Sequence, residues 1–503
     1  MENAGDKKRF SFEVPPPPVQ ESDISKTIDV DIVIAGAGLS GLSAALRAAE
    51  LGASVAVLEK TKSWNVRGGH ISAVNSRLWR EAGISNEKKD FVRAWIAACG
   101  NRAREEIVWL YAHKSEVAID WLVDHAQAHD NTPRLGAPRY AGPSYTEMYG
   151  AYLFKIQDTA KHLYEDALKL GAEYFFETPA VQLEKENGNV TAVIGKTSGG
   201  YIRFRAGKGV LLATGDIHGD PEMLEAYCPM FLKVKSSQYA PAGANTGDGH
   251  KMGLWAGGIM EDAPLPSVMH PQGYNRMQPF FLFVNIRGDR YMNEDTWCQA
   301  KSLNVLKQPG NVDYAYCIFD SNWREQMITG MPHSGGLFND NSVSVYGQPF
   351  TGEREQMFVD TGLENGLVKR ADTIEGLAGM IEIPPEKLRD TVDRYNTMVD
   401  NKDDADFGKR PELLFPIKEP PYYASKFGPA MLAVTGGLLV DTSLRVLDNE
   451  QNPINGLYAI GNVAGGLYGV DYPTIIPGSS HGRAVTWGYL AAENAVNQTV
   501  KEK

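Results

Sequence analysis

Three glycines near the N-terminus have the spacing of a phosphate-binding turn. Gly36, Gly38 and Gly41 form G-x-G-x-x-G within the segment GAGLSGL. The first glycine permits a tight turn, the second lets the backbone approach a pyrophosphate, and the third lets a helix lie close to a strand. Amides at the start of that helix then face the phosphates. We therefore expect a dinucleotide here, with Leu39 and Ser40 among its contacts.

An acidic residue completes this motif. Glu59 ends the next apolar segment, SVAVLE, and Lys60 follows it. A carboxylate about twenty residues after the glycines accepts hydrogen bonds from ribose hydroxyls and would repel a 2′-phosphate. The motif therefore disfavours NADP and leaves FAD or NAD.

The elements around the motif must hold it in place. From Asp29, the segment DVDIVIAG predicts a buried strand, LSGLSAALRAAELG a helix that ends at Gly52, and SVAVLE a second strand. A short crossover between buried strands is right-handed and joins them in parallel. The sequence therefore predicts an α/β fold with an open parallel sheet.

The 503 residues exceed one compact domain. Residues 1–28 are charged and proline-rich, and we expect a disordered tail. Residues 29–226 and 380–503 are expected to form the dinucleotide-binding domain, because strand patterns return near the C-terminus. Residues 227–379 mix short strands with Gly- and Pro-rich turns and are interpreted as an inserted domain.

Composition excludes several classes of protein. The net charge of −12 argues against nucleic acid as a partner. Cys99, Cys228, Cys298 and Cys317 form no CxxC, so iron–sulfur, zinc and c-type haem sites are not expected. No apolar run is long enough to cross a bilayer. As written, the chain is expected to be cytoplasmic, and export after removal of a leader is the alternative.

Two later segments identify the dinucleotide and the family. In GKGVLLATGD, the turn Ala213-Thr214-Gly215 resembles the second dinucleotide contact of FAD-dependent oxidoreductases, and GLYAIGN, ending at Gly461 and Asn462, resembles their segment beside the flavin ring. Nearly the whole chain, including NTGDGHKMGLWAGG, VNIRGDRYMNED and TWGYLAAENA, resembles the fumarate reductase and 3-ketosteroid dehydrogenase flavoproteins in family order. The resemblance implies a Rossmann-like FAD-binding domain with an inserted α+β capping domain, and substrate between cap and flavin.

The resemblance also implies further FAD contacts. These are Gly68, Gly69, His70, Ser72, Ala73, Val181, Asp248, Gly478 and Ser479. His70 stands where the family has asparagine, and a histidine near this point binds flavin covalently in succinate dehydrogenases. The segment HISAVNS does not match their HTVAA register, so non-covalent FAD is the favoured interpretation.

The cations that fumarate reductases need are missing from the matching positions. Cys298 or a neighbour replaces the proton-donating arginine, Ala433 replaces a substrate histidine, and Tyr472 or a neighbour replaces the arginine that clamps a carboxylate. Two carboxylates would therefore lack their partners.

The C-terminal segment GNVAGGLYGVDYPTIIPGSSHGRAVTWGY instead resembles ketosteroid dehydrogenases. In these enzymes a tyrosine, matched by Tyr472, and a following amide hold the substrate ketone. Residues Thr474 to Pro477 are extra here, so the matching amide is uncertain. The candidates for handling a second proton are Tyr145, Tyr149, Tyr291, Cys298 and His481.

The favoured hypothesis is an FAD-dependent ene-reductase or dehydrogenase acting on a CH–CH or C=C bond conjugated to a carbonyl, in a steroid-like or other enone substrate. Because haem and second flavin motifs are missing, a separate electron donor or acceptor is expected. Two alternatives remain: a fumarate-like carboxylate reductase that uses Arg276, Arg287 or Arg290, and a flavin-binding module without catalysis.

Overall fold

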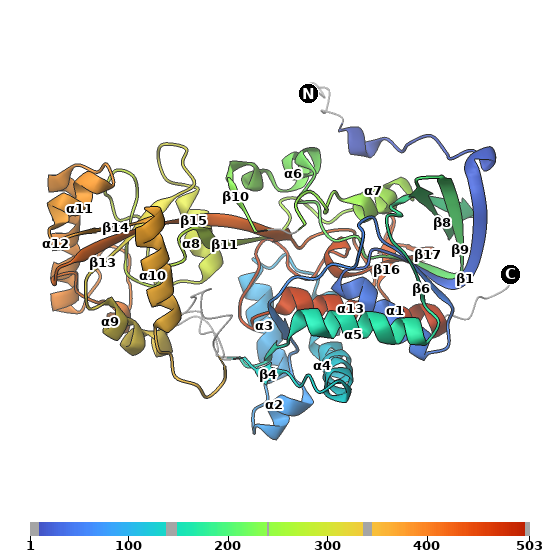
Figure 1. Cartoon of the computed structure of the whole chain (residues 1–503), viewed down its shortest axis with the longest axis horizontal. Helices are drawn as coiled ribbons and strands as arrows, with labels where there is room; N and C mark the ends of the chain where they lie inside the picture. Colours follow the sequence, from blue (N-terminus) through green and yellow to red (C-terminus); the bar gives the residue numbers. More distant parts are fainter. Residues whose placement is uncertain (1–9, 137–147, 239–240, 335–344, 498–503) are drawn as a thin grey trace.

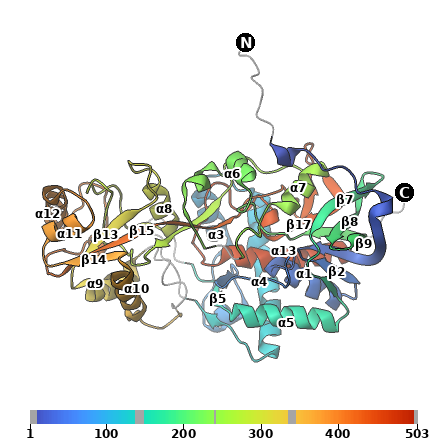
Figure 2. The same cartoon turned by 45° about the horizontal axis from the view of Figure 1, so that its top comes forward.

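The computed structural model describes residues 10–136, 148–238, 241–334 and 345–497. Its elements gather around two large sheets, which form the two lobes seen in Figure 1 and, from a second direction, in Figure 2. A smaller three-stranded sheet adjoins the first lobe.

The first sheet has eight strands and contains the predicted βαβ unit. Strand β1 pairs in parallel with β2 on one side and β9 on the other, and helix α1 makes the crossover. The strand order is β16-β17-β9-β1-β2-β6, with β8 beside β9 and β7 beside β8. The strands are β1 (Ile24–Ala35), β2 (Val55–Leu58), β6 (Glu173–Phe175), β7 (Ala180–Glu186), β8 (Asn189–Thr197), β9 (Gly200–Leu212), β16 (Arg445–Leu447) and β17 (Pro453–Ala459). The predicted α/β class is confirmed.

Helices cover this sheet because their small residues permit close contact. The alanine-rich face of α1 lies against α13, and α5 lies beside α1 (Figure 1). The helices of this lobe are α1 (Leu39–Glu50), α2 (Arg77–Glu81), α3 (Lys88–Ala98), α4 (Glu105–Ala128), α5 (Ile156–Lys169), α6 (Pro221–Tyr227), α7 (Asp248–Trp255) and α13 (Ser479–Asn497). The small sheet consists of β3 (His70–Ser72), β4 (Arg134–Leu135) and β5 (Ala151–Leu153).

The second sheet is built around one long strand, β15 (Tyr422–Val434). It pairs with four others, and Figure 1 shows it extending from the outer lobe to the middle of the molecule. The remaining strands are β10 (Ser236–Ser237), β11 (Ser267–Tyr274), β12 (Leu282–Val284), β13 (Ala315–Phe319) and β14 (Val368–Ala371). The helices are α8 (Cys298–Val305), α9 (Trp323–Gly330), α10 (Glu353–Asn365), α11 (Ile374–Met380) and α12 (Pro385–Asn401).

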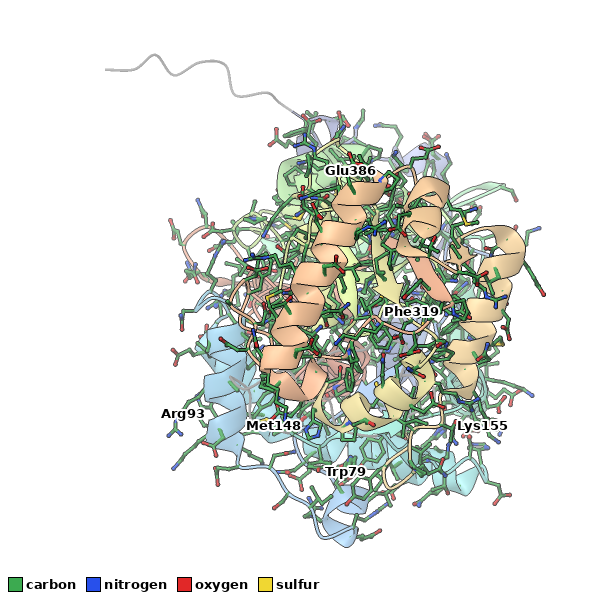
Figure 3. The ribbon with its side chains drawn as sticks, turned by 90° about the vertical axis from the view of Figure 1, so that its left-hand side faces the viewer. Trp79, Arg93, Met148, Lys155, Phe319 and Glu386 are labelled. Carbon is green, nitrogen blue, oxygen red and sulfur yellow. The ribbon has the colours of Figure 1, made fainter. Side chains whose placement is uncertain are left out.

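The boundary predicted at residues 379 and 380 is wrong. Helix α12 and strand β15 belong to the second lobe, whose apolar side chains they help to bury. Figure 3 looks onto this end, with Glu386 on the outside of α12 and the buried Phe319 inside. A helical pattern followed by a strand pattern does not encode the sheet to which the strand belongs, so sequence alone placed this segment in the wrong lobe.

The prediction of a disordered tail over residues 1–28 is wrong for residues 10–28, which the structure describes. Residues from Ile24 onward continue strand β1 along β9, and Phe12 is buried with only 3% of its surface exposed. The Phe12 ring lies 5.8 Å from Tyr227, and the Trp255 indole donates to the Phe12 carbonyl at 2.8 Å. A short aromatic anchor therefore orders a proline-rich segment. Residues 1–9 lie outside the described residues.

Among the described residues, the helices are all too short or too polar to cross a membrane.

Replacing Phe12 by Ala is expected to lower the free energy of unfolding by about 3 kcal/mol, because the substitution empties a buried aromatic site. Urea denaturation followed by tryptophan fluorescence measures the change. The matched control is Val14→Ala, since Val14 is 47% exposed and lies two residues away. Equal stability of the two variants would contradict the anchoring role.

Candidate active site

A cleft opens where the parallel strands of the first sheet end. Its walls include the residues that directly follow β1, β2 and β9, and Gly461 and Asn462 shortly after β17. Ligands of open α/β sheets bind outside the carboxyl ends of the strands, so this is the expected position for a dinucleotide. The predicted cofactor residues that line it are Gly36, Gly38, Leu39, Ser40, Glu59, Lys60, Ala213, Thr214, Gly215, Asp248, Gly461 and Asn462.

The glycine turn is shaped by two close backbone contacts. Gly36 has φ +112°, and a Cβ added to it would overlap the Ala213 carbonyl. A Cβ on Gly41 would overlap the Gly36 carbonyl, so a glycine at this position lets helix α1 lie close to the turn. Gly41 itself does not line the cleft. Gly38 has open space beside it, the nearest atom being the Asn65 carbonyl oxygen at 3.8 Å. A phosphate can therefore approach the backbone there.

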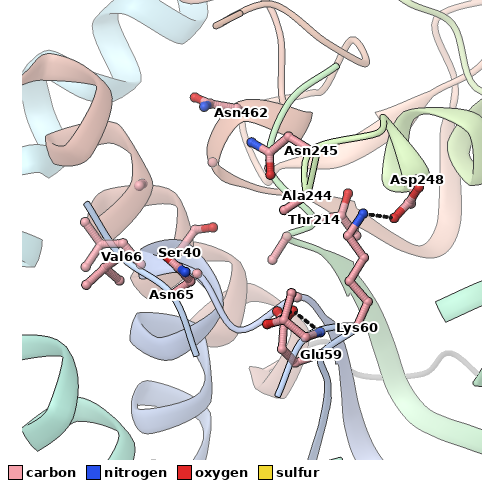
Figure 4. A pocket seen from close by; sticks show the side chains of 18 of the residues that line it. Ser40, Glu59, Lys60, Asn65, Val66, Thr214, Ala244, Asn245, Asp248 and Asn462 are labelled. Carbon is pink, nitrogen blue, oxygen red and sulfur yellow. Dashed lines mark hydrogen bonds and ion pairs between the residues drawn. The ribbon is translucent and has the colours of Figure 1, made fainter. Parts of the chain in front are cut away.

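Polar side chains organise the dinucleotide end. Glu59 accepts hydrogen bonds from the Ala37 amide at 2.9 Å and from the Thr61 amide and hydroxyl at 2.8 Å. Lys60 forms an ion pair with Asp248 at 2.9 Å, as Figure 4 shows, and donates to the Thr246 hydroxyl at the same distance. The Glu59 carboxylate is therefore fixed at the position expected for ribose recognition.

Several cleft residues were not found from the sequence. They are Leu58, Thr61, Asn65, Val66, Arg67, Pro179, Ala180, Pro241, Ala244, Asn245, Ser480 and Ala484. Asn245 stands in the NTGDG segment that carried the resemblance, and Figure 4 shows it beside Thr214. Arg67 donates to the Leu432 carbonyl on β15 at 2.7 Å. This bond joins the cleft wall to the central strand of the second lobe.

The segment from Gly68 to Ala73 runs behind the cleft wall. His481 lines the cleft, and its Nδ1 donates to the His70 carbonyl at 3.0 Å, while its ring faces Gly69. The His70 ring itself lies beside Gly136.

The other predicted contacts in this region also lie outside the cleft lining. Ser72 bonds to the Tyr111 hydroxyl at 3.0 Å, the Ala73 amide donates to Gly150, and Ser479 accepts from Tyr468 at 3.3 Å. Gly478, at φ +88°, lies against the His70 backbone. Val181 lies next to the cleft residue Ala180 without lining the cleft itself.

Tyr472 lies directly behind the end of the cleft formed by Ser480 and His481. Its hydroxyl oxygen accepts the Ser480 amide at 3.1 Å, at the first turn of α13. The side chain is buried, and burial raises its pKa. The Ser480 amide therefore donates to Tyr472 itself, and the Ser479 side chain is a second hydrogen-bond partner of this phenol.

Cys298 and His270 lie next to Tyr472. The Cys298 Sγ is 3.6 Å from His270 Nδ1, and the His270 and Tyr472 ring centroids are 6.4 Å apart. His270 lies on β11, which pairs with β15 through Val268 and Ala433. The sequence did not single out His270, because one histidine on a strand has no spacing signature. Cys298, which the sequence offered as one of several candidates, lies in this group.

The remaining candidates have other surroundings. Tyr291 packs against the core of the second lobe, and the Tyr149 ring is tilted against Trp79, with ring centroids 5.4 Å apart. Tyr145 lies outside the described residues. Arg290, which the carboxylate alternative could use, is held in ion pairs with Glu294 and Asp404, both at 2.8 Å.

Residues 31–473 match the family described as FAD binding domain. The chain belongs to this family. A vinyl phenol reductase of Lactiplantibacillus plantarum is 28% identical over 501 residues, which cover 95% of this chain and 98% of that protein. A fumarate reductase (cytochrome) of Shewanella frigidimarina is 25% identical, covering 94% of this chain and 78% of that protein.

Among solved structures, a 3-ketosteroid-Δ4-(5α)-dehydrogenase of Rhodococcus jostii, in complex with 4-androstene-3,17-dione, superposes with a TM-score of 0.73 at 23% identity. The match covers 96% of this chain and all of that one. The predicted family, the fold and FAD as cofactor are confirmed. The protein is an FAD-dependent oxidoreductase of the group that acts on carbon–carbon bonds.

The cleft has the features that FAD requires. No side chain can occupy the space between Gly36 and Ala213, Gly38 leaves its backbone open, and the first turn of α1 faces the cleft. In this arrangement the amides from Gly38 to Ser40 would hold the pyrophosphate and Glu59 the ribose. The ring would lie toward Asn462, Ser480 and His481.

Gly36→Ala is expected to weaken FAD binding at least about tenfold, because the new Cβ meets the Ala213 carbonyl and φ is strained. Equilibrium dialysis and the flavin-to-protein absorbance ratio measure this effect. Gly207→Ala on β9 is the control, since its added Cβ would lie 3.6 Å from its nearest neighbour, the Val30 carbonyl oxygen, which is an ordinary contact. A Gly36 variant that retains full flavin would refute the turn's role.

His481 predicts a pH-dependent contribution to stability. Burial lowers its pKa to about 4, whereas the unfolded value is about 6.5. The unfolded chain therefore binds the additional proton, and this part of the stability is present above about pH 6.5 and is lost as pH falls toward about 4.

Compared with His481→Gln, the wild-type Tm advantage is expected to shrink by about 1–3 °C between about pH 7.5 and about pH 5. Thermal melts of both FAD-loaded proteins measure it. The glutamine side chain can still donate to the His70 carbonyl. An advantage of the same size at both pH values would show that His481 titrates as an ordinary histidine.

Proposed function

We propose that this enzyme reduces or forms a carbon–carbon double bond conjugated to a carbonyl, as an enone reductase or a ketosteroid-type dehydrogenase. One observation carries the proposal: the buried Tyr472 hydroxyl accepts the Ser480 amide at 3.1 Å beside the cleft. A hydroxyl that accepts a backbone hydrogen bond directs its own proton elsewhere. A substrate oxygen beside the ring end of the cleft would receive it.

The protonation state of Tyr472 suits this role. Burial raises its pKa, so the phenol stays protonated near neutral pH and acts as a donor. Donation to a carbonyl withdraws electrons from a conjugated double bond, which makes its β-carbon a better hydride acceptor. The same bond acidifies a C–H beside a saturated ketone. Direction therefore depends on the substrate and the redox partner.

When bound, FAD supplies hydride transfer to or from a substrate carbon. The protein holds the substrate oxygen at Tyr472 and must move one proton at the neighbouring carbon. Cys298 and His270, 3.6 Å apart and beside Tyr472, are the groups we propose for that proton. Burial of this region keeps competing water away from the reacting carbons.

Two of the similar proteins support a conjugated, weakly charged substrate. The steroid in the Rhodococcus structure is an enone, and the Lactiplantibacillus protein is named for a vinyl phenol. A vinyl phenol places the double bond in conjugation with an oxygen through the ring, so the same Tyr472 hydroxyl could hold that oxygen. Because the match covers 95% of this chain and 98% of the Lactiplantibacillus protein, vinyl phenols are the second candidate class of substrate.

The carboxylate alternative has less support. Arg290 is already paired with two carboxylates, and its side chain is only 5% exposed. A dicarboxylate would therefore have to be held by other cations. We also propose that electrons come from, or pass to, a separate protein or small molecule, because the sequence has no haem or second flavin motif.

Tyr472→Phe is expected to lower kcat on a conjugated substrate by about 10²–10³-fold, because one preorganised donor to the substrate oxygen is lost. Stopped-flow flavin reoxidation measures the rate. The control is Tyr489→Phe on α13, whose ring lies 4.6 Å from the Arg47 guanidinium. Full activity of the Tyr472 variant with normal flavin content would overturn the proposed role.

A further inference from the structure

Two histidines and an aspartate meet on the flavin lobe, away from the cleft. His125 lies in the last turn of α4, His129 is its C-terminal cap, and Asp166 lies in the last turn of α5. Side chains four residues apart on a helix project from the same side, so both imidazoles can reach one point. None of the three lines the flavin cleft.

The ligand-type atoms converge closely. His125 Nε2 lies 2.9 Å from Asp166 Oδ2, and His129 Nε2 lies 2.6 Å from the same oxygen. All three atoms lie within 4.8 Å of one another. Zn²⁺ binds imidazole nitrogen and carboxylate oxygen at about 2.0–2.2 Å, which places tetrahedral ligands roughly 3.3 Å apart. A slight opening of the present contacts would therefore accommodate an ion.

The cluster is partly enclosed. The side chains of His125, His129 and Asp166 are 10%, 23% and 22% exposed, so an ion could enter from solvent. A further imidazole, His162, stacks on His129 with centroids 4.1 Å apart. His162 Nδ1 is buried without a hydrogen-bond partner among the described residues, as is His125 Nδ1. The site thus offers three converging ligands and one adjacent histidine.

The surrounding charges suit a cation. The cluster lies at the C-terminal turns of two helices, where the backbone dipole is negative. Against this, Asp166 carries the only carboxylate of the cluster, and Lys169 offsets part of its charge by pairing with its other oxygen at 2.7 Å.

We propose that His125, His129 and Asp166 form a binding site for a divalent transition metal of the Zn²⁺ class, with water or His162 in the fourth position. Neutral imidazoles with one carboxylate suit this class better than Mg²⁺ or Ca²⁺, which prefer oxygen ligands. The cysteine pattern had indicated no metal site, but it carries no information about histidine ligands on two helices.

The site would act on structure and not on the reaction. It would clamp the end of α4 to the end of α5, in addition to the ring stack of His129 on His162 and the hydrogen bond from Asn131 to Thr159 at 3.2 Å. At the other end of α5, Gln157 donates to the Val66 carbonyl at 2.8 Å, and Val66 lines the flavin cleft. An ion would therefore stabilise the helix that supports one wall of the cleft.

The test uses the untagged, FAD-loaded enzyme, treated with chelator and then dialysed against Zn²⁺ alone. We expect one tightly bound equivalent by metal analysis and a higher Tm with Zn²⁺, because binding to the folded state stabilises it. His129→Ala and Asp166→Asn are each expected to weaken binding at least about tenfold and to abolish the Tm increase. Flavin absorbance of each variant reports that it is folded.

The matched control is His113→Ala on the same helix. His113 stacks on Trp109 and lies outside the cluster, so its variant is expected to bind Zn²⁺ as the wild type does. The proposal fails if the wild type binds no Zn²⁺, or if His113→Ala loses as much binding as His129→Ala. It also fails if Asp166→Asn binds with unchanged affinity, since the ion would then lie elsewhere.

Discussion

The contact between the glycine turn after β1 and the loop after β9 determines where everything else in the flavin lobe lies. Gly36 and Ala213 approach so closely that no side chain fits between them. Parallel pairing of β1 with β2 and β9 brings the three strand ends to one edge. Glu59 and Thr214 therefore reach the same cleft from opposite sides, and the start of α1 faces the space between them.

Helix α13 connects the glycine turn to the end of the cleft where we propose that the substrate binds. It packs along α1, and its first turn supplies both cleft residues and the amide that holds Tyr472. Gly478 allows the turn to lie directly on the His70 backbone, and Arg483 fixes the loop of Asn462 through a hydrogen bond. From the second lobe, β11 carries His270 and the first residue of α8 is Cys298, and these two side chains meet beside Tyr472. The proposed substrate site thus forms where the two lobes meet.

The features that the sequence could predict were local ones. The strand, turn, helix and acidic residue of the first βαβ unit follow one another within thirty or so residues, so their spacing predicted the fold and a dinucleotide. The resemblance of two later segments to a known family then identified that dinucleotide as FAD. The candidate Tyr472 was found because one C-terminal segment resembles ketosteroid dehydrogenases. The lobe boundary could not be found, because pairing of β15 with β13 and β11 depends on residues far apart in the chain. His270 and the cluster of His125, His129 and Asp166 were missed for the same reason.

The most direct measurement of the central claim is anaerobic reoxidation of the chemically reduced enzyme. Stopped-flow absorbance would follow the flavin after mixing with a 4-ene-3-ketosteroid, a vinyl phenol, a cinnamate-like acid or fumarate. The account predicts rapid reoxidation by a substrate whose double bond is conjugated to an oxygen that Tyr472 can hold, and slow reoxidation by fumarate. Rapid reoxidation by fumarate alone would contradict it, and a flavin that none of these compounds reoxidises would favour the module without catalysis.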